Sequence, residues 1–379
     1  MDWKIIREQF PVMKEYLYFD LAQTSPLPLF ITKILEEHFR SQQMKGSNKE
    51  KWKEIINDAR TNFAKLVNAN PNEIAFVKNT SEGLNIAANG IQFKPGDNVI
   101  INNNEHPNNI YSWLNLEKKG IEVRWAPVKE SGLVFVEDIE PLIDKNTRAI
   151  SVSSVTFMPG SRNALKPIGK LCKENGIYFV VDAVQSMGLM NFDVKDLDID
   201  IFSTSGHKGL NAPHGVGIFF CRKEVLPEIK PTFVARASMT TQIAAQHDAL
   251  KYELFISDTA TKYEIGNHNY SAITALNESV KYLNSIGMDV IEERILDLSG
   301  LLTEGLKRIG AEVITSAEDE YRSSIVCFRT KNTADLHERL MENKVITSYR
   351  RNSIRASVGI YNNEEDVEML IKFVRELNK

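Results

Sequence analysis

Short apolar runs alternate with amphipathic segments through the first two thirds of the chain. Seven of these runs have the length and the β-branched or aromatic content of strands: Glu73–Lys78, Asn98–Asn102, Glu122–Trp125, Ala149–Ser153, Tyr178–Asp182, Ile199–Thr204 and Val216–Cys221. Between them, apolar residues at helical spacing predict helices over Ser81–Asn89, Val136–Ile143 and Leu165–Asn175. Several of the strands are apolar almost without interruption, which is typical of a mostly parallel sheet with helices on both faces. The pattern therefore predicts an α/β fold with a mostly parallel, seven-stranded sheet.

The pattern changes after residue 260. Two long helical patterns precede three short β segments and a last helix: Tyr270–Ser285, Met288–Ile309, Glu312–Thr315, Ser324–Arg329, Ile354–Ser357 and Glu364–Leu377. This order predicts a smaller α+β domain. We expect residues 16–260 to form the large domain, and residues 1–15 together with 261–379 to form the small one.

Composition and charge narrow the class of protein. The 379 residues are enough for two domains with well-filled cores. The net charge of −4 and the scattered Lys and Arg residues argue against a nucleic-acid groove and against binding to an anionic membrane. No apolar run has the length of a membrane span, about 20 residues, and the N-terminal MDWKIIREQF lacks the apolar core of a signal peptide. We therefore expect a cytoplasmic protein.

The three cysteines, Cys172, Cys221 and Cys327, are far apart in the sequence. Their spacing is not that of metal ligands, and three cysteines are too few for a disulfide framework, so we predict no metal site. Cys221 and Cys327 lie in the apolar runs GIFFC and IVCF, which predicts buried thiols.

Polar motifs follow several of the predicted strands, where ligands bind in an open α/β sheet. Asp182 closes YFVVD, with Gln185 three residues later; the segments 79–83 (NTSEG), 105–109 (EHPNN) and 205–209 (SGHKG) follow other strands. A pyridoxal phosphate site needs parts of these kinds. It needs a lysine that forms an imine, a carboxylate beside the ring nitrogen, a helix N-terminus for the phosphate, and a ring that covers the cofactor.

Each of these groups also has an ordinary structural interpretation. A lysine in a glycine-rich loop, such as Lys208, is usually a solvated surface charge. Asp182 could cap the turn that follows it, and Thr80 and Ser81 could form a plain helix N-cap. His106 could be a loop histidine without a ligand. The interpretation as a cofactor site depends on the whole set occurring together.

Five motifs in a fixed order carry a resemblance to a known family: NTSEGLN (79–85), EHPNN (105–109), VVDAVQS (180–186), STSGHKG (203–209) and IRASVGIYNNEEDV (354–367). From about Tyr16 to the C-terminus the chain resembles the class V aminotransferase family, the cysteine-desulfurase-like group of fold-type-I pyridoxal-phosphate enzymes. The resemblance implies a lyase or transferase with the fold of those enzymes, an amino-acid substrate and the cofactor pyridoxal 5′-phosphate.

The resemblance also implies a role for each matching residue. Lys208 forms the Schiff base with the cofactor and moves the Cα proton, and His106 stacks over the ring. Asp182 pairs with the ring nitrogen, and Gln185 bonds to the phenolate oxygen. The phosphate is bound by a set of hydroxyl and imidazole groups: Thr80, Ser81, Ser205 and His207.

Other residues are implied on the substrate side and at a subunit interface. Arg355 matches the arginine that takes the substrate's α-carboxylate; its alternative role is an ion pair with an acid of the segment 364–366. Gln23 lies in the segment that lines the substrate side, and Arg236 is either a binder of an acidic substrate group or a surface charge. Asn267 stands where desulfurases usually have a threonine that reaches the neighbouring subunit's phosphate, so we expect a homodimer.

One departure from the family bears on the reaction. Cysteine desulfurases carry a nucleophilic cysteine shortly before the carboxylate-binding arginine, but the segment 345–357 (VITSYRRNSIRAS) is short and contains none. The resemblance therefore favours C–S bond cleavage without a catalytic cysteine, with transamination or epimerisation as the alternative. A non-catalytic fold homologue and a sugar aminotransferase are remoter alternatives, because Lys208, Asp182, His106 and Arg355 are all in place.

Overall fold

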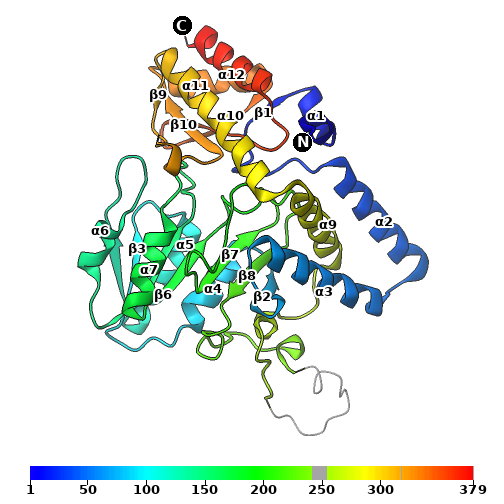
Figure 1. The fold of residues 1–379 in the computed structure, drawn as a ribbon, viewed down its shortest axis with the longest axis vertical. Helices are drawn as coiled ribbons and strands as arrows, with labels where there is room; N and C mark the ends of the chain where they lie inside the picture. The colour runs from blue at the N-terminus through cyan, green and yellow to red at the C-terminus, as the bar shows by residue number, and fades with distance from the viewer. Residues whose placement is uncertain (241–253, 317, 379) are drawn as a thin grey trace.

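The computed structural model describes residues 1–379 except 241–253, 317 and 379 (Figure 1). A seven-stranded sheet with the order β2-β8-β7-β6-β5-β3-β4 lies at its centre. Its strands are β2 (Ile74–Val77), β3 (Asn98–Asn102), β4 (Glu122–Ala126), β5 (Thr147–Ser153), β6 (Tyr178–Asp182), β7 (Ile201–Ser205) and β8 (Gly217–Cys221). Neighbours from β4 to β7 are parallel, whereas β8 is antiparallel to both β7 and β2. The predicted α/β fold with seven mostly parallel strands is confirmed, and the predicted strand ends are at most two residues off.

Helices cover both faces of this sheet, which explains the continuously apolar strands. One face packs against α4 (Thr80–Gly90) and α5 (Pro107–Leu114), through alternate strand residues such as Ala75 and Val77. The other face packs against α7 (Leu165–Asn175) and α3 (Lys49–Leu66), through the intervening residues such as Ile74 and Phe76. The predicted helix Val136–Ile143 is α6 (Val136–Ile139) followed by a 3₁₀ turn over Glu140–Leu142.

The C-terminal part forms a four-stranded antiparallel sheet, β12-β13-β10-β9, at the top of Figure 1. Its strands are β9 (Glu312–Val313), β10 (Ile325–Arg329), β12 (Ser348–Arg350) and β13 (Ser353–Ser357), and its helices are α10 (Met288–Arg308), α11 (Thr333–Glu342) and α12 (Glu364–Leu377). The N-terminal segment joins this part. β1 (Leu17–Tyr18) pairs with β11 (Val345–Ile346), and Arg7 of α1 (Trp3–Glu8) forms an ion pair with Asp366 at 2.5 Å.

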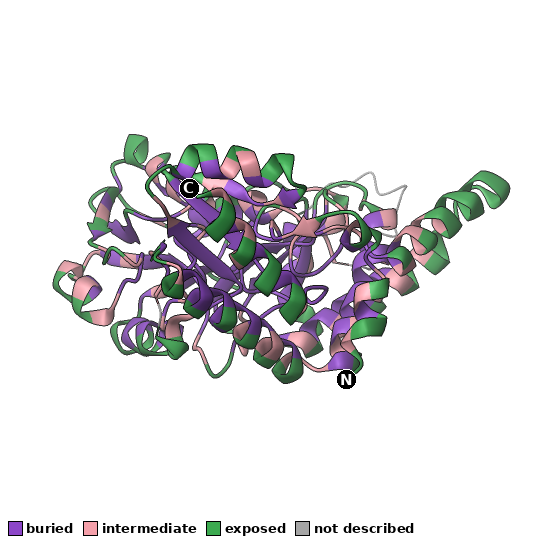
Figure 2. Cartoon of the chain, turned by 90° about the horizontal axis from the view of Figure 1, so that it is seen from above, coloured by how far each residue is buried: buried purple, intermediate pink, exposed green. Residues whose placement is uncertain are grey.

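Two long helices, α2 (Leu29–Lys45) and α3, were not predicted from the sequence. They form a hairpin, and both pack against α9 (Tyr270–Ile286). The far end of the hairpin projects from the molecule and is exposed (Figure 2). α9 belongs to the predicted small domain, whereas α3 belongs to the predicted large one. Their contact shows that packing continues across residue 260, and the division into domains stays a prediction. Among the described helices none is both long and apolar enough to cross a membrane.

Candidate active site

A cavity of about 250 Å³ lies at the carboxyl ends of β5, β6 and β7, beside the start of α4. Its volume is near the lower end of small-molecule pockets, about 300–1,000 Å³. Nine residues that the sequence analysis singled out line it: Gln23, Thr80, Ser81, His106, Asp182, Gln185, Ser205, His207 and Lys208. The fold brings them together because parallel strands end at the same edge of a sheet.

Lys208 and Asp182 form a titratable pair in this cavity. Asp182 is the last residue of β6, and Lys208 follows the neighbouring strand β7 by three residues. Burial lowers the pKa of the Lys208 amine to about 8, and the charge of Arg355 adds to this effect while Asp182 opposes it. Burial raises the pKa of Asp182 to about 7. A lysine with so low a pKa has a neutral amine in a substantial share of molecules near neutral pH, which imine formation requires.

Asp182 keeps most of its hydrogen-bonding capacity for a ligand. Its Oδ1 accepts a hydrogen bond from the Val184 backbone N–H at 3.0 Å, and this is the one hydrogen bond of the carboxylate within the described part of the chain. Gln185 donates from Nε2 to the carbonyl oxygen of Ala22 at 3.1 Å. This bond ties the strand end to the N-terminal segment that carries Gln23.

The start of α4 provides a site for an anion. The N-cap is Asn79, not Thr80 or Ser81, and its side chain accepts from the Glu82 N–H at 3.0 Å. The Thr80 N–H donates to Ser205 Oγ at 2.8 Å. The Ser81 N–H and hydroxyl donate to no group among the described residues. A helix N-terminus with unused donors beside a cavity suits a phosphate group.

Two imidazoles border the cavity, and both are neutral at physiological pH. Burial and the charges of Lys208 and Arg355 lower the pKa of His106 to about 4. His106 Nδ1 accepts from the Asn108 N–H at 3.2 Å, and its ring meets Phe157 edge-on at 5.0 Å. Burial and the charge of Lys208 likewise lower the pKa of His207 to about 4.

Arg355 lies behind the cavity wall. It is buried on β13, where its Nη1 donates to the carbonyl oxygen of Phe157, a lining residue, at 3.1 Å. Its ion pair is with Asp20 at 3.5 Å, outside the segment 364–366 that the alternative interpretation named. Its Nε is buried without a hydrogen-bond partner among the described residues.

Two candidates from the sequence do not line the cavity of this chain. Asn267 and Arg236 are exposed. Asn267 was expected to act across a subunit interface, and both roles stay predictions. No group of three or more potential metal ligands occurs among the residues that the structure describes.

Glu105 was not expected to have a role, although it precedes His106 in the motif EHPNN. This carboxylate is buried and accepts hydrogen bonds from Asn102 Nδ2 at 2.6 Å, Asn109 Nδ2 at 2.9 Å and the Ser153 backbone N–H at 2.7 Å, as well as from the Ser153 hydroxyl. Burial raises its pKa, and its charge in turn raises the pKa of Asp182.

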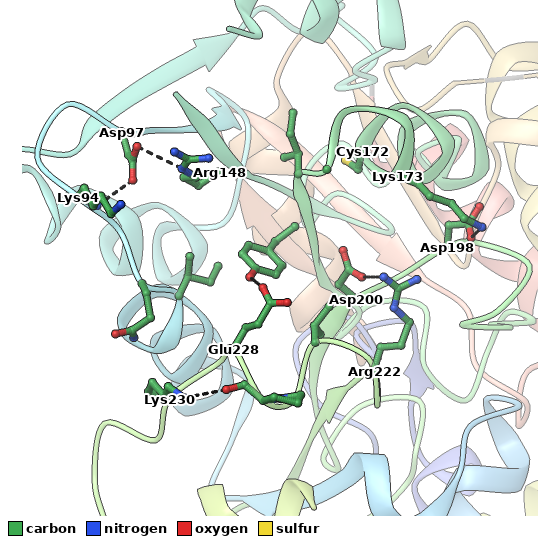
Figure 3. A pocket seen from close by; sticks show the side chains of 17 residues that line it. Lys94, Asp97, Arg148, Cys172, Lys173, Asp198, Asp200, Arg222, Glu228 and Lys230 are labelled. Atoms are coloured by element: carbon green, nitrogen blue, oxygen red, sulfur yellow. Dashed lines mark hydrogen bonds and ion pairs between the residues drawn. The ribbon is translucent and has the colours of Figure 1, made fainter. Parts of the chain in front are cut away.

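A larger cavity, of about 750 Å³, lies at the opposite edge of the sheet, near the start of β6 (Figure 3). Its lining is strongly charged, but the charges are largely neutralised within it by three ion pairs: Arg148–Asp97 at 3.2 Å, Lys173–Asp198 at 2.5 Å and Arg222–Asp200 at 2.5 Å. The smaller cavity, with its convergent and unused polar groups, is therefore the candidate active site.

Comparison with known proteins gives one family. The family model described as aminotransferase class-V matches residues 17–370. An uncharacterized aminotransferase of Schizosaccharomyces pombe is 30% identical over 381 residues, which cover 98% of this chain and 96% of that protein.

Solved structures give the same fold. A cysteine desulfurase of Thermococcus onnurineus NA1, in its apo structure, has a TM-score of 0.90 at 25% identity and covers 99% of this chain and 98% of its own. A cystine C–S lyase in complex with cysteine persulfide has a TM-score of 0.89 at 21% identity and covers 98% of this chain and 100% of its own. The second likeness shows the fold alone.

Proposed function

Because this chain belongs to the class-V aminotransferase family, and to its cysteine-desulfurase-like group, we propose that it cleaves a C–S bond of an amino acid with pyridoxal phosphate held on Lys208. One observation carries the proposal. The amine of Lys208 and the carboxylate of Asp182 lie in the same cavity, and burial brings the pKa values of both close to neutral. Titratable groups with such shifts are typical of catalytic sites.

The residues of the cavity fit the cofactor on two independent points. Asp182 has acceptor capacity that no described group uses, which suits a ring N–H, and the first turn of α4 has unused donors at Ser81, which suit a phosphate. Thr80, Ser205 and His207 would complete the phosphate site, Asn267 of a second copy would add to it, and Gln185 would bond to the phenolate oxygen.

Pyridoxal phosphate, when bound, supplies a ring that stabilises negative charge at the substrate's Cα. Asp182 would hold the proton on the ring nitrogen, since it is an acceptor in a buried site. The Lys208 amine would hold the cofactor and then move the Cα proton, because its lowered pKa makes it a base near neutral pH. His106 would cover the ring as a neutral imidazole, and Arg355 would bind the α-carboxylate in place of its long contact to Asp20.

We further propose that no cysteine takes part as a nucleophile. The three cysteines of the chain are all buried, and burial raises the pKa of the Cys327 thiol to about 12. A thiol of that pKa carries almost no thiolate at neutral pH, and the thiolate is the nucleophile. A β-elimination needs no such group: the Cα proton is removed, the C–S bond breaks, and the sulfur leaves with the electron pair and takes up a proton as a thiol or persulfide. Water then hydrolyses the released 2-aminoacrylate to pyruvate and ammonia.

The decisive experiment has two parts. Purified protein with pyridoxal phosphate is reduced with borohydride and mapped, and we expect the label on the peptide with Lys208. The Lys208→Ala variant should lose the imine absorbance, whereas Lys166→Ala, which removes an exposed lysine, should keep it. A label on another lysine would refute the assignment of the site.

The second part identifies the reaction. Cystine and cysteine are supplied while pyruvate, sulfide and the cofactor absorbance are followed. Pyruvate formation that survives Cys327→Ser supports elimination without a cysteine. Conversion of the cofactor to its amine form supports the alternative, transamination, and loss of the optical activity of the substrate without pyruvate supports epimerisation. The homodimer and a cytoplasmic location stay predictions.

A further inference from the structure

Two arginines that neither the motifs nor the family resemblance singled out stand at the substrate side of the cavity. They are Arg350, the last residue of β12, and Arg351, the first residue of the turn to β13. Arg350 donates from Nη2 to Gln23 Oε1 at 3.3 Å, and Gln23 lines the cavity. The guanidinium of Arg351 lies 5.1 Å from the ring centre of Phe157, which also lines the cavity. Both cations therefore contact the wall of the candidate active site.

Both arginines are exposed, and a tight turn fixes the backbone where they are attached. Only Arg351 and Asn352 separate the paired residues Arg350 and Ser353, and their φ angles are +45° and +57°. Two positive φ angles in a two-residue loop are typical of a type I′ turn, which favours Asn and Gly. An arginine in the left-handed region is uncommon and disfavoured, so its presence at the cavity calls for a reason beyond turn formation.

The charges at this end of the cavity do not balance. Arg350, Arg351 and Arg355 bring three guanidinium groups, and Asp20 is the one carboxylate with which any of them interacts among the described residues. Arg351 bonds instead to the amide oxygen of Asn104, at 2.7 Å. Binding of one α-carboxylate at Arg355 still leaves one positive charge in excess, because Asp20 can balance only one of the other two guanidinium groups. A second anionic group on the ligand would supply it.

We propose that Arg350 and Arg351 bind an anionic group at the far end of the substrate, so that the enzyme acts on amino acids whose β-substituent carries a carboxylate or a similar anion. This inference rests on the proposed function, because it extends the same site. It gives the shortened segment 345–357 a role: the tight hairpin holds two cations where desulfurases carry a cysteine loop.

A matched pair of ligands tests the inference. S-carboxymethyl-L-cysteine and S-carbamoylmethyl-L-cysteine have almost the same shape and differ by one negative charge. Dissociation constants are measured by calorimetry with the holoenzyme, and KM and kcat are measured from pyruvate release. We expect the acid to bind at least about tenfold tighter than the amide, with the difference mostly in KM and reduced at high salt.

The variants separate charge from structure. In Arg351→Gly combined with Arg350→Gln, the ratio of the two dissociation constants should fall to within about twofold of one, while the melting temperature is kept, because glycine suits the left-handed turn. Arg351→Lys should retain part of the discrimination. Lys372→Gln, which removes an exposed charge on α12, should leave the ratio unchanged.

The outcomes distinguish this inference from the proposed function. Equal affinity for the acid and the amide in the unmodified enzyme overturns the inference, whether or not either compound is cleaved. A ratio that survives loss of both arginines also overturns it. Discrimination in binding without pyruvate release would support the anion site and refute C–S cleavage of these compounds.

Discussion

The Lys208 amine should react in the cofactor-free chain at a pH where other lysines are inert. Burial lowers its pKa from 10.5 to about 8. At pH 7.5, a pKa of about 8 leaves about one amine in four neutral, whereas a pKa of about 10.5 leaves about one in a thousand. The neutral amine is the reactive form, so Lys208 should be acylated on the order of a hundredfold faster than an ordinary lysine of equal access.

Two substitutions should move this pKa in opposite directions. Asp182 raises the pKa of Lys208 by its charge, so Asp182→Asn should lower it. Arg355 lowers that pKa, so Arg355→Met should raise it. The same change removes the ion-pair partner of Asp20, whose charge also raises the pKa of Lys208. A shift of about one pKa unit would raise the neutral fraction at pH 7.5 about threefold in Asp182→Asn and lower it about eightfold in Arg355→Met.

Competitive labelling with trace isotopic acetic anhydride between pH 6 and 11 measures the effect, with the exposed lysines of the same sample as internal standards. The label on the Lys208 peptide should show a midpoint near pH 8 in the unmodified chain, lower in Asp182→Asn and higher in Arg355→Met. A midpoint near that of the standards would contradict the burial argument. Shifts of the same sign in both variants would contradict the electrostatic one.

Three further predictions concern the frame of the site. Glu264→Gln should lower the free energy of unfolding in urea by about 3–5 kcal/mol, because it leaves the buried Arg60, 2.8 Å away, without its charge partner; replacing both by apolar residues should cost less. Gly83→Ala should destabilise by about 1–3 kcal/mol, since its Cβ would lie 2.1 Å from Ser203 Oγ, and Ser203→Gly should restore part of the loss. Glu105→Gln should lower the free energy of unfolding by about 1–3 kcal/mol, because the new side-chain NH₂ group would face the hydrogen-bond donors that now bind the carboxylate. An unchanged urea midpoint would show that the carboxyl group is protonated.

The sequence predicted the central sheet well because burial on both faces makes each strand a continuous apolar run. α2 was missed for the converse reason. It buries only Ile31 along its length, so it has no apolar stripe of the width that the periodicity argument needs. α3 does carry such a stripe, with Ile56, Ala59 and Phe63 buried at helical spacing, so its pattern was present in the sequence and was overlooked. Short strands such as β11 and β12 depend on tertiary pairing and carry almost no local signal.

The residues proposed to hold the cofactor could be predicted because they directly follow strands. A motif at the end of a predicted strand is thereby also placed at the edge of the sheet where ligands bind. The substrate side could be predicted only in part: the family resemblance placed Gln23 and Arg355 there, whereas Arg350 and Arg351 were not singled out. It joins Gln23 from the N-terminal segment, Phe157 from the loop after β5, and Arg350 and Arg351 from a hairpin near the C-terminus. These segments are far apart in the sequence, and no periodicity relates them.

The two sides of the site also differ in whether their charged groups titrate near neutral pH, and this difference constrains how substrate preference depends on pH. On the cofactor side, burial brings the pKa values of Lys208 and Asp182 close to neutral, so both groups change charge near physiological pH. On the substrate side the cations are guanidinium groups, which stay charged at any working pH. Preference for an anionic substrate should therefore persist across the pH range in which activity rises and falls with the Lys208 amine. If the preference titrated together with kcat, one group would set both the activity and the affinity for the anion, and the arginines would not be the groups that select the substrate.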